Sequence, residues 1–391
     1  MKSRIEELDT IRGYAIFGIL VCNIFYFHHP LEYFHQFFLS NKSASNEVFN
    51  FIRFNYFAER TYTIFSLLFG IGIGMQFQNF NKQNHSFLKQ HSIRMFILFL
   101  LGILHTFFFW YGDVLTLYAL LGFCIIPLLN KGFKTLLSIS IILYLIPTIY
   151  VILSRNGIYE INFGKTQSIS LDESINQNTS QGILGHLKYN FGQIKLVYEY
   201  YATGVMFSSL AMITLGFSIA KTKVFYKKVI DTKTHKKVLM FCIPLIILWS
   251  LYKLFIFKHE EMDNPFNFYI FWFLSNTSAI AQTFFVFSGF FLFYNSKLSN
   301  SIILKGFNKM GKLSLTNYIS HSLFGLLVYK VLGFFGQSNP TFDFLLSIGL
   351  TIVQIIISHC ILVKYGKGPL ENIWRKLTKL LLNEKQHTTH R

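Results

Sequence analysis

The sequence predicts an all-α, polytopic membrane helix bundle, and three observations lead to that fold class. Hydrophobic residues make up 52% of the 391 residues and charged residues only 14%, whereas soluble domains carry about 25% charged residues. About ten apolar runs are long enough to cross a hydrocarbon layer of ~30 Å as helices. Basic residues concentrate in alternate connecting segments, as expected of a chain that crosses a membrane repeatedly.

The apolar runs define the expected membrane spans. They cover residues 11–27, 61–78, 94–111, 114–130, 135–153, 196–220, 238–257, 267–294, 313–335 and 342–363. No small-residue cleavage site follows the first run, so we expect it to be retained as a helix. The expected organisation is one transmembrane helical domain over residues 1–363 and a cytoplasmic basic amphipathic tail over residues 364–391.

The charge distribution predicts that both chain ends lie in the cytoplasm. With the N-terminus inside, most of the 36 Lys and Arg residues fall in cytoplasmic segments, which is the usual bias. Residues 221–237 then form an inner basic loop whose partners are anionic membrane lipids. Residues 154–195 form an outer polar loop, either a connector or a lid. The net charge of +18 therefore predicts topology, and no nucleic-acid partner is expected.

An amphipathic helix is predicted after the last span. Gly368 and Pro369 interrupt one helix and start another. The apolar face of the new helix would hold Leu370, Ile373, Trp374, Leu377 and Leu381, and its other side Arg375, Lys376 and Lys379. This pattern is typical of a helix that lies in the inner headgroup layer.

Polar residues within the first span are candidates for a binding site, because a charge at bilayer depth costs about 2–3 kcal/mol. Asp9 and Arg12 lie three residues apart and can pair on one helix face. Asn23 follows eleven residues after Arg12, close to the same face. Arg12 either reaches out to lipid phosphates or holds an anionic substrate at the cytoplasmic mouth.

The stretch "LGILHTFFFWYGDVLTLYALLG" over residues 101–122 contains one histidine, His105, and one aspartate, Asp113. If the chain reverses near Gly112, the two side chains share one cavity. A histidine beside a carboxylate is the usual proton-handling pair. The alternative is a neutral histidine that is hydrogen-bonded to a backbone carbonyl or a serine, and an aspartate that caps the next helix.

Further polar residues complete the set of candidates. Glu59 and Arg60 open the second span, Asn317 lies with His321 in the ninth, and Glu199 lies near the outer end of the sixth. A polar face of this kind either lines a cavity or joins helices by hydrogen bonds. The cysteines lack the spacing of a metal site, so no metal is expected.

Five stretches resemble one known family in order along the chain. They are "RIEELDTIRGYAIFGILVCN", "TIFSLLFGIGIG", "LGILHTFFFWYGDVLTLYALLG", "GKLSLTNYISHS" and "GPLENIWRKLT". The sequence is identified by them as a member of the YeiB-like family of bacterial integral membrane proteins, domain of unknown function 418. The resemblance implies a multi-pass protein of the bacterial plasma membrane.

That family is similar to the transmembrane acyltransferase superfamily, which moves acyl groups from cytoplasmic acyl-CoA to acceptors across the membrane. The resemblance implies that Arg12 matches an arginine of the superfamily's first span. A histidine eleven residues later in the sugar O-acyltransferases is replaced here by Asn23. The family usually has glutamine at the position of His321, so His105 becomes the candidate for the reactive histidine.

The hypothesis that follows is an envelope acyltransferase. Arg12 and Asn23 would help to bind the acyl donor, and His105, oriented by Asp113, would act as general base or acyl carrier. Acyl-CoA would be a co-substrate, an envelope glycan or lipid the acceptor, and no cofactor stays bound. A small-solute transporter and a non-catalytic membrane module are the alternatives.

Overall fold

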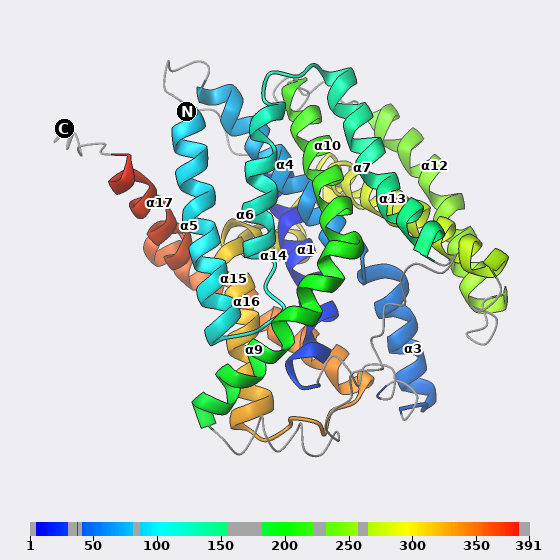
Figure 1. Ribbon diagram of the computed structural model, residues 1–391, viewed down its shortest axis with the longest axis vertical. Helices are drawn as coiled ribbons and strands as arrows, with labels where there is room; N and C mark the ends of the chain where they lie inside the picture. The colour runs from blue at the N-terminus through cyan, green and yellow to red at the C-terminus, as the bar shows by residue number, and fades with distance from the viewer. Residues whose placement is uncertain are drawn as a thin grey trace.

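The computed structural model describes residues 5–29, 37, 41–80, 87–154, 182–222, 232–256 and 265–382, and all of its regular elements are helices (Figure 1). The longer helices are α1 (Glu6–Asn23), α3 (Ala44–Ile52), α4 (Arg60–Phe80), α5 (Phe87–Phe108), α6 (Leu115–Cys124), α7 (Phe133–Ser154), α9 (Gly182–Tyr200), α10 (Met206–Lys221), α12 (Thr232–Leu251), α13 (Pro265–Tyr294), α14 (Ile302–Lys312), α15 (Ser314–Gly325), α16 (Pro340–Tyr365) and α17 (Pro369–Leu381). Short helical turns join them: η1 (Ile24–Phe27), η3 (Arg53–Phe57), η4 (Ile126–Leu128), η5 (Tyr201–Val205), η6 (Tyr252–Ile256), η8 (Lys297–Asn300) and η9 (Leu326–Val331).

The helices have the length and surface of a membrane protein. Among the described residues, five are long and apolar enough to cross a membrane: Glu6–Phe27, Phe87–Phe108, Thr232–Ile256, Tyr269–Tyr294 and Pro340–Tyr365. Three further apolar helices are shorter. Large apolar side chains lie exposed along α12 and α16, including Met240, Phe241, Ile352, Ile356 and Val363, an arrangement that water disfavours and lipid tolerates. The number of spans and their direction stay predictions.

The centre of the bundle is α1, which contacts α4, α13, α14, α15 and α16 (Figure 1). Its approach to α14 depends on glycines. A Cβ atom at Gly13 would lie 2.0 Å from the carbonyl oxygen of Phe307, and one at Gly311 would overlap the carbonyl oxygen of Asp9. Small residues allow such backbone contact between membrane helices, and this contact holds Arg12 beside the start of α15.

The glycines of α4 differ in what surrounds them. A Cβ atom at Gly70 of α4 would lie 2.0 Å from the carbonyl oxygen of Ile213 in α10, and Gly216 of α10 meets Leu67 of α4 in the same way. Gly74 also faces α10. A Cβ atom at Gly72, in contrast, would have no atom within 4 Å, because Gly72 lines a cavity.

Replacing Gly70 by alanine is expected to destabilise the protein by about 1–3 kcal/mol, because α4 and α10 must move apart to admit the methyl group. The measurement is thermal unfolding of the purified protein in detergent. Gly349→Ala on α16 is the matched control, since its Cβ meets open space. An equal melting temperature for both variants would contradict the close backbone contact.

Part of the predicted outer loop is helical, which corrects the assignment of residues 154–195. Residues 182–195 form the first turns of α9, while residues 155–181 lie outside the described residues. Asn190 and Gln193 are buried and Phe191 is exposed, so this helix turns its polar side toward the protein. A search for apolar runs does not detect a helix whose amide side chains face inward.

Other boundaries also differ from the predicted spans. The ninth span is divided between α15 and the wider turn η9, and the fourth is the short α6 followed by η4. Residues 232–237 of the predicted inner loop begin α12. The remainder of that loop, residues 223–231, and the end of the chain, residues 383–391, lie outside the described residues.

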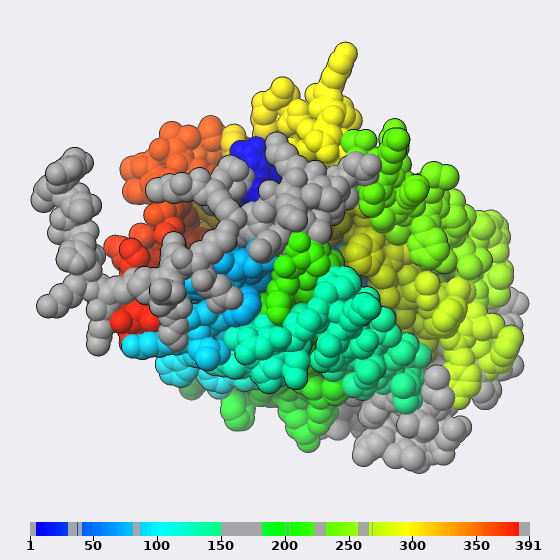
Figure 2. Space-filling view, turned by 90° about the horizontal axis from the view of Figure 1, so that it is seen from above, coloured from blue at the N-terminus to red at the C-terminus, as the bar shows by residue number. Residues whose placement is uncertain are grey.

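The C-terminal helix α17 packs on α5 and α15. In Figure 2 its red atoms lie at one edge of the molecule, beside the cyan atoms of α5. Trp374 donates a hydrogen bond from Nε1 to the Arg94 carbonyl oxygen at 3.1 Å, and the Arg94 guanidinium lies 4.3 Å from the centre of the tryptophan ring. Ile373, Leu377 and Leu381 are exposed. Trp374 is thus bound to α5, and a headgroup position for the rest of this face stays a prediction.

Candidate functional site

The end of α5 brings His105 and Asp113 together, as the sequence predicts. His105 Nδ1 lies 2.8 Å from Asp113 Oδ1, and His105 Nε2 lies 2.9 Å from the hydroxyl oxygen of Ser322 on α15. His105 and Asp113 are each 1% exposed and Ser322 is 2% exposed. A serine, a histidine and an aspartate are therefore connected in series inside the bundle.

Local chain geometry produces the pairing of His105 with Asp113. The amides of Phe109 and Trp110 both bond to the carbonyl oxygen of His105, so α5 ends one turn beyond the histidine. The chain then turns and starts α6, where Asp113 Oδ2 accepts hydrogen bonds from the amide of Thr116 at 2.8 Å and from its hydroxyl at 3.0 Å. Asp113 thus caps α6 and also binds His105; a proton-handling role for the pair stays a prediction.

A glycine makes room for this arrangement. A Cβ atom at Gly102, one turn before His105, would lie 2.4 Å from the Thr116 hydroxyl and 2.8 Å from Asp113 Oδ2. Any side chain at this position would displace the carboxylate that faces His105.

Hydrogen-bond chemistry assigns the tautomer of a neutral His105. An aspartate carboxylate accepts hydrogen bonds and donates none, so Nδ1 of the histidine carries the proton that points at Asp113. The lone pair of Nε2 then accepts the hydroxyl proton of Ser322. This is the arrangement in which an imidazole acts as a base toward a hydroxyl group.

A cavity of about 320 Å³ opens beside this cluster at the end of the bundle that holds α17, and we call it the basic cavity. The cationic residues among those that line it are Arg12, Arg94, Lys312, Lys367 and Arg375. Apolar side chains from α4, α5 and α6 line it further in, including Phe65, Leu68, Phe69, Leu98 and Leu115. Its volume falls within the range of small-molecule sites.

Glu371, the acidic residue that lines the basic cavity, already accepts hydrogen bonds from α15. Glu371 of α17 accepts hydrogen bonds from the amides of Leu315 and Thr316, at 2.7 and 3.1 Å, and from the Thr316 hydroxyl at 2.6 Å. The carboxylate thereby caps the start of α15.

The basic cavity reaches the His105–Asp113 pair at Tyr318, one of its lining residues. The Tyr318 hydroxyl donates to Asp113 Oδ1 at 3.4 Å and accepts from the amide of Val114 at 3.1 Å. The ring centres of Tyr318 and His105 lie 5.4 Å apart. Tyr318 is therefore the wall between the cavity and the histidine.

A second, small cavity of about 20 Å³, which we call the far cavity, lies on the other side of the cluster. Ser322 lines it with aromatic side chains and three polar residues, His186, Asn190 and Lys330. The Lys330 ammonium lies 2.7 Å from His186 Nδ1. This space has room for about one water molecule, so a larger acceptor must displace side chains to enter.

The structure places Arg12 at the basic cavity but does not bring Asn23 there. Arg12 Nη1 lies 2.8 Å from Asp9 Oδ1, which is the predicted pair, and Arg12 also lines the cavity. Asn23 ends α1, eleven residues or about 16 Å further along the helix. It is not among the residues that line the basic cavity, so a shared donor site for Arg12 and Asn23 is not formed.

Asn317 and His321 face away from the cluster. Asn317 Nδ2 donates to the Met310 carbonyl oxygen and to the Ser358 hydroxyl, at 2.9 and 3.0 Å. His321 Nε2 lies 3.2 Å from the amide oxygen of Gln354. These bonds join α15 to α14 and α16, as expected when a polar face connects helices by hydrogen bonds.

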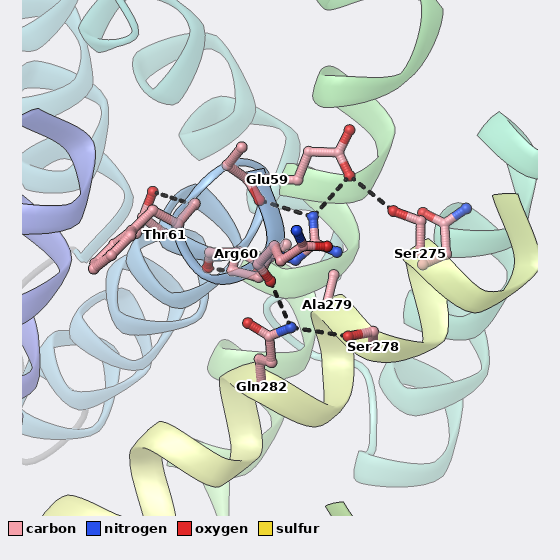
Figure 3. A network of polar contacts seen from close by, with 12 residues as sticks. Glu59, Arg60, Thr61, Ser275, Ser278, Ala279 and Gln282 are labelled. Carbon is pink, nitrogen blue, oxygen red and sulfur yellow. Dashed lines mark hydrogen bonds and ion pairs between the residues drawn. The ribbon is translucent and has the colours of Figure 1, made fainter. Parts of the chain in front are cut away.

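Glu59, Arg60 and Glu199 lie away from His105. Glu59 accepts from Ser275 at 3.5 Å and lies 3.5 Å from the Arg60 guanidinium (Figure 3). Arg60 is buried, its Nη1 donates to the Ala58 carbonyl oxygen, and among the described residues its Nε and Nη2 find no hydrogen-bond partner. Glu199 is exposed and pairs with Lys195 at 3.9 Å.

A second buried histidine–carboxylate pair was not predicted. His28 Nε2 lies 2.9 Å from Asp343 Oδ2, and the Tyr329 and Ser338 hydroxyls donate to Asp343 Oδ1. Burial, with His28 adjacent, lowers the pKa of the neighbouring His29 to about 4. His28 and Asp343 lie 315 positions apart, so no local pattern joins them. The adjacent histidines after the first span were the available signal.

The sequence has relatives that match nearly its whole length. Residues 219–380 match the model of a family described as a protein of unknown function, DUF418. The uncharacterized protein YxaH of Bacillus subtilis is 27% identical, and the match covers 97% of this chain and 95% of YxaH. The uncharacterized protein YeiB of Escherichia coli is 23% identical, with 95% of each chain covered. The family model and these relatives together support a YeiB-like DUF418 assignment for this chain.

A third relative of this YeiB-like protein extends the match. An uncharacterized 39.9 kDa protein from the amylase 3' region of Bacillus acidopullulyticus is 25% identical, over 97% of this chain and 94% of its own length. All three relatives are bacterial. Among the described residues, no group of three or more His, Cys, Asp or Glu side chains could hold a metal ion.

Proposed function

We propose that this YeiB-like protein is a membrane acyltransferase that takes an acyl group from acyl-CoA and transfers it to a hydroxyl or amine of an envelope glycan or lipid. The observation that carries the proposal is the position of the His105–Asp113 pair behind a cavity with a cationic mouth and an apolar wall. Acyl-CoA has phosphates at one end and a thioester at the other. It would enter such a cavity with its phosphates at the cationic mouth and its thioester toward His105.

The mouth of the basic cavity suits the phosphate groups of the donor. Arg12, Lys312, Lys367 and Arg375 line it, and charge-assisted hydrogen bonds from such groups to phosphate are the strong ones. With the predicted orientation, this mouth opens to the cytoplasm, where acyl-CoA is found.

The inner part of the cavity suits the pantetheine arm and acyl chain. Its wall is mostly apolar and ends at Tyr318, next to Asp113 and His105. His105 can take a proton from an attacking hydroxyl, and a general base of this kind contributes typically 10²–10⁴-fold to a rate.

The test uses purified protein in liposomes with radiolabelled acetyl-CoA and, separately, a long-chain acyl-CoA. We expect release of free CoA thiol and transfer of label to an envelope lipid or glycan fraction. Gly72→Leu is expected to abolish both, because the leucine side chain would extend into the cavity without a backbone clash.

Gly349→Leu is the matched control, because a side chain there also meets open space but on the exposed face of α16. It should retain wild-type activity. Wild-type liposomes that release no more thiol than Gly72→Leu liposomes, with either donor, would refute an acyltransferase. Solute uptake without thiol release would instead favour a transporter.

A further inference from the structure

We propose that Ser322 is a nucleophile that carries the acyl group as an ester between the two cavities. The inference rests on the proposed function and names the route that the acyl group takes. Three features of the site carry it: the serine–histidine–aspartate series, the direction of its hydrogen bonds and its place between the cavities.

The distances are those of an activated serine. Ser322 Oγ lies 2.9 Å from His105 Nε2, and His105 Nδ1 lies 2.8 Å from Asp113 Oδ1. A nucleophile and its base are expected within about 2.6–3.2 Å, with a third group orienting the base. Both contacts meet this criterion without any movement of the helices.

The carboxylate is held in place from several sides. Asp113 Oδ2 accepts two hydrogen bonds from Thr116, and Oδ1 accepts from Tyr318 as well as from His105. A carboxylate that is held in this way keeps the proton on Nδ1 of His105 and leaves Nε2 free to deprotonate Ser322.

Ser320 of the same helix has a different environment. Ser320 donates its hydroxyl proton to the Asn317 carbonyl oxygen at 2.8 Å and accepts from Gln354 at 2.7 Å. Such bonds satisfy a hydroxyl group without increasing its nucleophilicity. Ser320 is therefore a matched control on α15, two residues from Ser322.

The position of Ser322 explains why a covalent carrier is useful. Tyr318 lines the basic cavity and Ser322 lines the far cavity, and the two residues lie four apart on α15, which is about 6 Å along a helix. The partition between the cavities is thus about one helical turn thick. The thioester reaches Ser322 from the basic cavity when the Tyr318 side chain turns aside, and the ester that forms lines the far cavity, where the acyl acceptor consumes it.

The chemistry balances in two steps. Ser322 Oγ attacks the thioester carbonyl carbon while its proton passes to His105 Nε2; the C–S bond breaks, and the CoA sulfur leaves with that proton. The acceptor hydroxyl or amine then attacks the ester carbonyl and gives its proton to Nε2. The C–Oγ bond breaks and Ser322 recovers the proton. The sum is thioester and acceptor converted to acylated acceptor and thiol.

The first experiment traps the acyl group. The full-length protein is incubated with [¹⁴C]acetyl-CoA without acceptor and quenched in acid. We expect label on Ser322 that is stable to acid and released by alkaline hydroxylamine. Ser322→Ala should remove the label and lower turnover at least ~100-fold, while Ser320→Ala should retain both. Ser322→Cys should give label that neutral hydroxylamine releases, as expected of a thioester.

The outcomes separate this inference from the proposed function. Full transfer by Ser322→Ala would overturn the carrier and leave the acyltransferase standing, with direct transfer or an acyl-histidine in its place. No thiol release by the wild type would refute the acyltransferase itself.

A second experiment does not depend on the donor. A fluorophosphonate probe reacts with activated serines, so we expect it to modify Ser322 in the wild type and in Ser320→Ala but not in His105→Asn. A wild-type protein that does not react at Ser322 would overturn the inference whatever the acyl donor is.

Discussion

Replacing His105 by asparagine is expected to lower acyl transfer by about 10²–10⁴-fold, because the substitution removes the base at Nε2. The amide nitrogen of asparagine can still donate to Asp113 in place of Nδ1. The carboxylate also retains its bonds to Thr116 and Tyr318, so we expect the protein to fold. The measurement is thiol release from labelled acyl-CoA, at donor concentrations that give kcat and KM separately.

The decrease in acyl transfer should appear in kcat and not in KM, because His105 does not line the basic cavity. His359→Asn is the matched control: this histidine lies exposed on α16, and its replacement should leave turnover unchanged. Wild-type kcat in His105→Asn, at equal expression and melting temperature, would exclude His105 as the base.

Reversing two charges at the mouth of the basic cavity, in Lys312→Glu/Lys367→Glu, is expected to raise the KM for acyl-CoA about 10–100-fold. Each lost hydrogen bond between charged groups is worth about 1.5–3 kcal/mol before solvent screening. The change should leave kcat within a few-fold of wild type, because both lysines lie at the mouth and the reacting groups lie behind Tyr318.

Lys376→Glu/Lys379→Glu provides a control with the same change in net charge. Both residues lie on α17 but do not line the cavity. If binding is local, this control should keep the wild-type KM. Equal increases in both double variants would mean that the overall positive surface attracts the donor and that the cavity does not bind its phosphates. The wild-type KM should also rise with salt, as expected for screened phosphate contacts.

Sequence patterns identified the pair at the centre of the site because its two members are neighbours in the chain. His105 and Asp113 are separated only by the end of one helix and a short turn. The expected end of the helix and a turn at Gly112 are therefore enough to place them together. The Asp9–Arg12 pair was predicted for the same reason, a spacing of three on one helix. The all-helical class followed from composition and the lengths of the apolar runs.

The parts of the site that the sequence did not predict depend on contacts between helices that lie far apart along the chain. Ser322 lies 217 positions from His105, and the polar face of the ninth span offered several hydroxyl and amide groups without a rule to choose among them. The structure divides that face: Tyr318 and Ser322 turn to the site, while Asn317 and His321 turn to α16. The first part of helix α9, residues 182–195, was not predicted because its buried side includes the amide side chains of Asn190 and Gln193.

The capping of α15 by Glu371 makes the end of the chain a structural component of the site. Deleting the chain from Gly368 onward would expose the amides of Leu315 and Thr316 and remove Trp374 from Arg94. Such a truncation alters the helix that bears Ser322, although it removes none of the reacting groups. Purification tags and fluorescent reporters should therefore be appended beyond Leu381, and shortened versions of this protein are unsuitable as references for activity.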